Sequence, residues 1–226
     1  MTVGQTESKL KARGIGKPHW YGAMYQAQRT DLLPLIPKSS RCVLDVGCCT
    51  GNLGAILKER GAYVAGVEID AEAADLATRK LDRVVIASAE AIDLPFQESF
   101  FDCVIYGDVL EHLLDPWAAI RRHTSFIEPG GTVITSIPNV QYWRVILNLL
   151  RGRWNYTTGG SLDWGHLRFF TLTGMTAMLE QAGYANIEVF HSAHGRRSAP
   201  IYAFLPPRLR PFIVWRYYLR GKKMVS

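Results

Sequence analysis

The stretch VLDVGCCTGNLG, residues 43–54, decides the fold. It opens with an apolar run typical of a buried strand, passes through a turn with glycines at 47 and 51, and continues with helical spacing of apolar residues. A strand, a glycine-rich turn and a helix in this order are typical of a site for a nucleotide-like cofactor. The stretch therefore predicts an α/β fold with a cofactor at its first turn.

The same alternation of strand and helix continues along the chain. We expect strands at 42–46, 63–67, 84–87, 101–106, 132–137 and 187–190, and helices at about 51–60, 71–81, 109–123 and 173–182, with another ending at 150. A further amphipathic helix is expected at 20–33, and Pro129-Gly130-Gly131 predicts a turn. Because the strands lack strict polar alternation, they predict a doubly wound, mostly parallel sheet with helices on both faces.

Length and composition favour one main domain. The chain has 226 residues, of which 48% are hydrophobic, enough for one sizeable core. We expect an N-terminal helical cap at 1–37, a core at 38–195 with a substrate-side insertion at 140–170, and a basic aromatic segment at 196–226 that completes the sheet. The start of the chain lacks the apolar centre of a signal peptide, and the four cysteines suit reduced thiols, so a cytoplasmic protein is expected.

The net charge of +6 is concentrated in the last segment. Residues 196–226 hold eight Lys or Arg and no acid, so the remainder has a net charge of −2. Interleaved aromatic and basic residues suit contact with a membrane surface, an anionic substrate or a nucleic acid. The simpler interpretation, which we favour, is a final strand and a docked helix with their basic side in water.

The identity of the cofactor follows from the turn. A dinucleotide fingerprint needs glycine at the first, third and sixth positions, whereas this turn has Gly47, Cys49 and Asn52 there, which disfavours NAD and FAD. Asp45 at the strand end and Glu68 after the next strand instead fit S-adenosylmethionine. Its ammonium can meet the first carboxylate, and its ribose hydroxyls can donate to the second.

Several segments in order resemble the class I S-adenosylmethionine-dependent methyltransferases over residues 21–190. VLDVGCCTG and GVEID are similar to the first two motifs of that family, and ASAEAIDLPFQESFFDCVIYGDVLEHLLDP and EPGGTVITSIPN are similar to later segments. The resemblance implies a Rossmann-like, seven-stranded sheet and S-adenosylhomocysteine as product. The cofactor-binding residues that it and the turn imply are Asp45, Gly47, Cys48, Gly51, Glu68, Ile69, Ser88, Ala89, Glu90, Gly107, Tyr21 and Arg29. Two positions depart from the family, which usually has glycine at Cys49 and an acid near Ser88.

The candidate catalytic residues follow the fourth strand. In GDVLEHL, Asp108, Glu111 and His112 have the spacing of one helical face. This DxxEH resembles the ExxEH of ubiquinone-pathway O-methyltransferases and small-RNA terminal-ribose O-methyltransferases, and His166 in HLRFFT resembles a further histidine of the RNA group. Together the four side chains could hold a divalent ion. We favour a metal-free site with His112 or His166 as general base, while Glu111 could equally pair with an arginine of the following helix.

The function predicted from these residues is O-methylation of a small-molecule, glycan or lipid-linked hydroxyl. The segment 140–170, rich in tryptophan and arginine, resembles a bacterial subgroup associated with cell-surface sugar assembly. Two alternatives stay open: a metal-dependent RNA terminal-ribose methyltransferase, and a non-catalytic cofactor-binding partner subunit. The charge of −2 outside the last segment disfavours nucleic acid. Contact of that segment with the inner membrane face is compatible with a lipid-linked acceptor.

Overall fold

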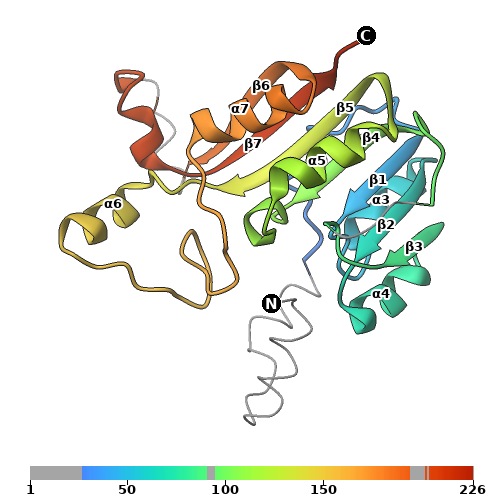
Figure 1. The fold of residues 1–226 in the computed structure, drawn as a ribbon, viewed down its shortest axis with the longest axis horizontal. Coiled ribbons are helices and arrows are strands. Elements are labelled where there is room, and N and C mark those ends of the chain that lie inside the picture. Colours follow the sequence, from blue (N-terminus) through green and yellow to red (C-terminus); the bar gives the residue numbers. More distant parts are fainter. Residues whose placement is uncertain (1–26, 91–94, 194–201, 203, 226) are drawn as a thin grey trace.

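Seven strands form one sheet in the computed structural model, which describes residues 27–90, 95–193, 202 and 204–225 (Figure 1). The elements are β1 (Cys42–Val46), α3 (Asn52–Glu59), β2 (Tyr63–Glu68), α4 (Ala71–Thr78), β3 (Arg83–Ile86), β4 (Phe101–Gly107), η1 (Leu110–His112), α5 (Pro116–Thr124), β5 (Ile127–Pro138), α6 (Trp143–Leu150), α7 (Leu172–Gln181), β6 (Tyr184–Ala193), η2 (Arg210–Ile213) and β7 (Val214–Lys223). Most of the expected strands and helices are present, with shifted ends.

The sheet confirms the predicted fold class. Its strand order is β3-β2-β1-β4-β5-β7-β6, and all pairings from β3 to β5 are parallel. The strand β7, from the basic C-terminal segment, is antiparallel to both β5 and β6. Chain order reverses between β1 and β4, which opens a crevice at the carboxyl ends of these two strands. The fold is therefore Rossmann-like, and the division into cap, core and C-terminal segment stays a prediction.

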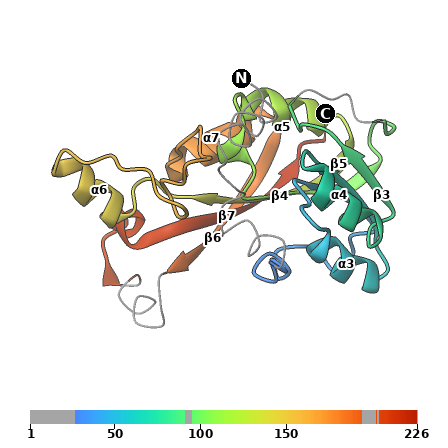
Figure 2. The ribbon, with the colours of Figure 1, turned by 90° about the horizontal axis from the view of Figure 1, so that it is seen from below.

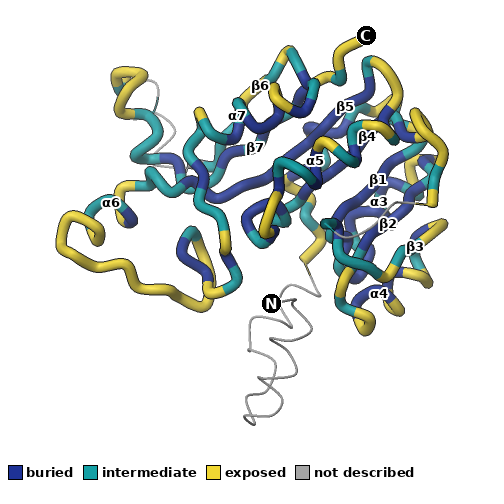
Figure 3. The backbone as a smooth tube through the Cα atoms, viewed as in Figure 1, coloured by how far each residue is buried: buried dark blue, intermediate teal, exposed yellow. Residues whose placement is uncertain are grey.

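Helices cover both faces of the sheet, as apolar strands require (Figure 2). On one face, Leu53 and Leu57 of α3 pack in a cluster with Leu32 and Ile105. On the other face, side chains of α5 and α7, among them Ile120 and Met178, pack in a second cluster. The tube coloured by burial shows the central strands dark and the loop after α6 exposed (Figure 3). Burial on both faces leaves the strand ends as the place for polar chemistry.

Local sequence explains where the helices begin. Asp70 caps α4 by accepting from the backbone N–H groups of Glu72 and Ala73, and Asp115 caps α5 by accepting from that of Ala118. Proline at the first position of α5 suits a helix start, because its missing N–H has no helical partner there. Because Asp115 and Pro116 begin a new helix, the expectation of a single helix at 109–123 is wrong. The structure has the short 3₁₀ helix η1, then an extended Leu113, then α5.

Two further expectations fail at the edges of the fold. Of the helix expected at 20–33, residues 20–26 lie outside the described residues, and residues 30–36 form turns instead of a helix. Arg29 has a φ of 48°, and the following hydrogen bonds join Leu32 to Arg29 and Leu35 to Leu32, three residues apart. The expected turn at Pro129-Gly130-Gly131 is a bulge inside β5, where the register against β4 shifts between Phe101 and Cys103.

All four cysteines are free thiols, as expected. Within the described ranges, no helix has both the length and the apolarity needed to cross a bilayer.

Candidate active site

A cavity of about 420 Å³ lies at the crevice where chain order reverses. The ends of β1, β2 and β4 contribute its walls, together with the turn after β1 and the segment before η1. Of the predicted cofactor residues, the following line it: Asp45, Gly47, Cys48, Glu68, Ile69, Ser88, Ala89, Glu90, Gly107 and Arg29. Gly51 belongs to the turn but not to the lining, and Tyr21 lies outside the described residues.

The turn after β1 has a conformation that requires glycine. Gly47 has a φ of 72°, and a Cβ placed there would overlap a methyl group of Val109. Gly51 has a φ of 74° and lies against Ala77 of α4. Cys49 adopts a φ of 50°, so the residue that departs from the family pattern keeps the left-handed conformation that glycine adopts easily.

The carboxylate of Glu68 organises this turn. One oxygen accepts from the backbone N–H of Cys49 at 2.9 Å, and the other accepts from those of Ile69 and Asp70, each at 2.8 Å. Burial nevertheless raises the pKa of Glu68. The oxygen that accepts only from Cys49 has further acceptor capacity, so a ribose hydroxyl of a cofactor can still donate to it.

Asp45 is the buried acid of the cavity, with 4% of its surface exposed. Burial raises its pKa to about 7, and the nearby carboxylate of Glu68 adds to the rise, while Arg29 opposes it. A buried carboxyl near neutrality gains most from a cationic ligand. The position suits the ammonium group of an amino acid moiety.

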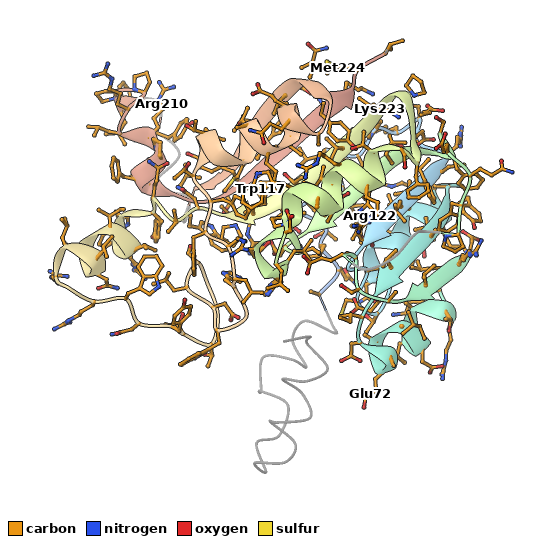
Figure 4. All side chains as sticks on the ribbon, in the orientation of Figure 1. Glu72, Trp117, Arg122, Arg210, Lys223 and Met224 are labelled. Carbon is orange, nitrogen blue, oxygen red and sulfur yellow. The ribbon has the colours of Figure 1, made fainter. Side chains whose placement is uncertain are left out.

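The far end of the cavity is made of backbone and short side chains. The hydroxyl of Ser88 accepts from the backbone N–H of Glu90 at 3.2 Å, and the carboxylate of Glu90 accepts from that of Asp115 at 2.6 Å. Arg122 of α5, labelled in Figure 4, donates to the Glu90 carbonyl oxygen. The Glu90 side chain is thus engaged by the protein, which leaves Ser88 and backbone groups for recognition of a base.

Asp108 does not share a helical face with Glu111 and His112, contrary to the spacing argument. It precedes η1 with a φ of 59°, and one of its carboxylate oxygens forms ion pairs with Arg29 at 3.1 Å and Arg216 at 3.0 Å. Its other oxygen accepts from the Ser136 hydroxyl at 2.7 Å. Asp108 therefore connects Arg29, Ser136 of β5 and Arg216 of β7 at the cavity wall. It holds the guanidinium of Arg29 next to Gly107, where a Cβ added to the glycine would meet it.

Glu111, His112 and His166 do come together. One potential ligand atom from each lies within 4.8 Å of the others, and the two imidazole rings meet edge to face with centroids 4.8 Å apart. The Nδ1 of His112 lies 3.0 Å from the Gly165 carbonyl oxygen, and that of His166 lies 3.2 Å from the Ser161 carbonyl oxygen. With Nδ1 as the donor in both rings, the Nε2 lone pairs are free to accept a proton or bind an ion.

The carboxylate of Glu111 is buried, and neither of its oxygens has a hydrogen-bond partner among the described residues. Burial raises its pKa well above the usual range, and Asp108 adds to the rise. A buried carboxylate without donors is costly as an anion, so it is either protonated or balanced by a cation. One carboxylate and two imidazoles fit a divalent transition ion, which these three residues would hold and which would lower the pKa of an acceptor hydroxyl.

Only His112 of the two histidines lines the cavity, together with Gly165. Burial lowers the pKa of both imidazoles, which favours their neutral form. The geometry brings one of them, His112, to the wall of the cavity.

The sequence analysis missed Arg216, Ser136 and Gly165. Arg216 and Ser136 reach the site because β7 and β5 pair there, with Arg216 opposite Pro138. Such long-range pairing leaves no local signal. Gly165 could have been found in the sequence, because it stands next to the candidate His166. In the structure, a Cβ at this position would press on the ring of His112.

Comparison with known proteins identifies the family of the chain. Residues 19–189 match a family described as a methyltransferase domain. The chain belongs to this family. An uncharacterized methyltransferase of Mycobacterium tuberculosis is 30% identical to it over 137 residues, which cover 54% of this chain and 70% of the relative. A ubiquinone biosynthesis O-methyltransferase of Idiomarina loihiensis is 29% identical over 156 residues, which cover 65% of this chain and only 63% of that enzyme.

Among solved structures, an S-adenosylmethionine-dependent methyltransferase from Archaeoglobus fulgidus is similar to this methyltransferase in fold. Its TM-score is 0.67 at 17% identity, over 99% of this chain and 100% of that one. The family assignment and the fold make the protein an S-adenosylmethionine-dependent methyltransferase, with S-adenosylhomocysteine as the product of its cofactor.

Proposed function

We propose that this methyltransferase transfers the methyl group to a hydroxyl of a small molecule or of a glycan or lipid-linked acceptor. The observation that carries the proposal is the imidazole of His112 on the cavity wall, with its Nδ1 3.0 Å from the Gly165 carbonyl oxygen. Its free Nε2 can take the proton that a hydroxyl must lose.

The reaction balances without a further reactant. The acceptor oxygen forms a bond to the methyl carbon while the bond from that carbon to the sulfonium sulfur breaks in line, giving the neutral thioether of S-adenosylhomocysteine. The hydroxyl proton passes to His112 Nε2 and then to solvent. Asp45, Glu68 and the turn hold the donor, because the rate of an in-line displacement depends chiefly on positioning.

The relatives support a hydroxyl acceptor at the level of analogy. The ubiquinone biosynthesis relative is named an O-methyltransferase, and its similarity includes the region of the candidate catalytic residues. The tryptophan- and arginine-rich segment 140–170 would supply the acceptor side. Attachment to a membrane through 196–226 remains part of this proposal.

A second candidate is the same transfer assisted by a divalent ion, including transfer to an RNA terminal ribose. The buried carboxylate of Glu111, which has no hydrogen-bond partner among the described residues and lies 3.9 Å from His166 Nε2, favours this candidate. A chelator separates the two candidates, because it should abolish activity only where a divalent ion assists the transfer.

The deciding experiment combines binding with turnover. Calorimetry with S-adenosylhomocysteine is expected to show one site in the wild type, in His112→Asn and in the matched control His191→Asn, whose ring lies on β6 against Tyr202. Incubation with bacterial extract and labelled cofactor is expected to give a labelled acceptor with wild type and control. Loss of a general base typically costs 10²–10⁴-fold in rate, so His112→Asn should give almost none.

Equal labelling by His112→Asn and wild type would refute the base assignment. A label on nitrogen or carbon instead of oxygen would refute O-methylation. If a chelator removes activity and added Mn²⁺ or Zn²⁺ restores it, and Glu111→Gln abolishes that rescue, the metal-assisted candidate replaces the metal-free one.

A further inference from the structure

The helix α6 is apolar and has few partners in the described fold. Of its eight residues only Val145 is buried, while Trp143, Leu149 and Leu150 are 44%, 52% and 79% exposed. Short helices in proteins owe most of their stability to packing of one face, so this exposure is unusual. In Figure 1, α6 and the loop after it extend from the sheet at one end of the molecule.

The helix and the loop after it, residues 143–157, are called the arm here, and the arm carries only positive charge. Arg144, Arg151 and Arg153 lie within it, and no Asp or Glu occurs from residue 139 to 162. Trp154 and Tyr156, which follow these cations in the chain, are about a third exposed. Exposed apolar, aromatic and arginine side chains without acids form a surface that is complementary to an anionic, amphipathic partner.

A second segment with the same chemistry lies at the same end. In residues 204–213, Phe204 and Leu209 are exposed, and Arg208 and Arg210 are the charged residues. Arg210 is labelled there in Figure 4, on the same side of the molecule as α6. The base of the arm is bonded to this segment, because the Asn139 side-chain amide donates to the carbonyls of Pro211 and Val214, both at 2.8 Å.

We propose that the arm and residues 204–213 form a docking surface for an anionic lipid bilayer. Tryptophan and tyrosine prefer the water–lipid interface, leucines such as Leu150 would enter the acyl region, and arginines pair with anionic headgroups. The segment that includes Trp164, which is 68% exposed, also includes Gly165 on the cavity wall. The surface is independent of the proposed base and of the atom that is methylated.

The test uses the full chain and vesicles. Sedimentation with vesicles of equal parts phosphatidylglycerol and phosphatidylcholine is compared with pure phosphatidylcholine. Two double variants remove one property each: Arg151→Gln with Arg153→Gln, and Leu149→Ser with Leu150→Ser. The matched controls are Arg121→Gln on α5 and Leu76→Ser on α4, which are exposed elsewhere. Calorimetry with S-adenosylhomocysteine checks that each variant folds.

Wild type and controls are expected to bind the anionic vesicles and not the neutral ones. Loss of two arginines is expected to weaken partitioning about thirtyfold, at about fivefold per cation near an anionic surface, and the serine pair is expected to weaken it at least as much. Equal binding to neutral vesicles, binding unchanged in both double variants, or binding of single-stranded RNA in place of vesicles would each overturn the proposal.

Discussion

The two sides of the cavity are built differently. On the cofactor side, backbone groups of the turn after β1 are fixed by hydrogen bonds, with Glu68 accepting from three N–H groups and Val67 O from two. On the acceptor side, residues 139–168 have backbone hydrogen bonds as well, such as that from Thr157 to Leu162, and they add ring contacts such as Tyr156 on Trp164, with centroids 5.4 Å apart. The comparison teaches that the donor side is built around one carboxylate that fixes a turn, whereas the acceptor side adds a layer of aromatic side chains.

The largest effect is expected from the cofactor side. Glu68→Ala removes the acceptor of three backbone N–H groups and of the ribose hydroxyls, and each bond to a charged group contributes about 1.5–3 kcal/mol. Affinity for S-adenosylhomocysteine should fall on the order of a hundredfold or more, with a lower melting temperature, by calorimetry. Glu59→Ala on the exposed side of α3 is the control. If the Glu68→Ala protein kept wild-type affinity, the hydrogen bonds that fix the turn on the cofactor side would not be needed for cofactor binding.

The next effect tests the turn itself. Gly47→Ala forces a side chain into a left-handed conformation and against Val109, for which about 2–4 kcal/mol of destabilisation is expected. Adding Val109→Ala should relieve the overlap but not the backbone strain, so about half the loss should return in urea unfolding. Complete recovery in the double variant would show that backbone conformation contributes little.

The third prediction concerns pH. Because burial raises the pKa of Asp45 to about 7, the carboxyl loses its charge as pH falls through 7, and affinity for the cationic cofactor should drop up to tenfold per pH unit. The folded pKa also lies above the unfolded value of 3.8, so the ligand-free protein loses stability as pH rises from about 4 through 7. Asp45→Asn should flatten both profiles. Calorimetry and thermal unfolding at pH 5.5–8 check this, and identical slopes in variant and wild type would contradict it.

The smallest effect is expected on the acceptor side. Trp164→Ala removes an exposed ring stacked on Tyr156, so the unfolding free energy should change by about 0.5 kcal/mol or less. Amide exchange in residues 157–168 should become faster, while cofactor affinity stays within about twofold of wild type. A tenfold loss of cofactor affinity would contradict this prediction, because it would mean that the cofactor side and the acceptor side of the cavity are energetically coupled.

Sequence reasoning succeeded where local pattern and structure coincide. The strand before Gly47, the acid Glu68 and the helices between the first strands follow from apolar runs, glycines and caps within a few residues. It failed where a single residue overrode the pattern, as when Pro116 divided the helix expected at 109–123. The bulge at Gly130 arose from pairing with β4, which a chain taken alone does not display.

The candidate site divides in the same way. That Asp45, Gly47, Cys48 and Glu68 line one cavity could be predicted, because a single βαβ unit carries them. The surroundings of Asp108 could not, since Arg29 and Arg216 are 187 positions apart and meet only in the assembled sheet. The grouping of His112 with His166 was predictable only through resemblance to other enzymes, because the two rings come from separate segments.

The place of β7 has a consequence for biosynthesis. This strand is the last of the seven in chain order, yet it lies between β5 and β6. Until it emerges from the ribosome, those two strands present unpaired edges, and unpaired edges in incomplete chains favour aggregation. Arg216 reaches Asp108 only with β7, so the nascent chain can form the turn after β1 well before this ion pair. A ribosome stalled shortly before β7 would hold a chain whose turn is formed and whose Asp108 still lacks its second arginine.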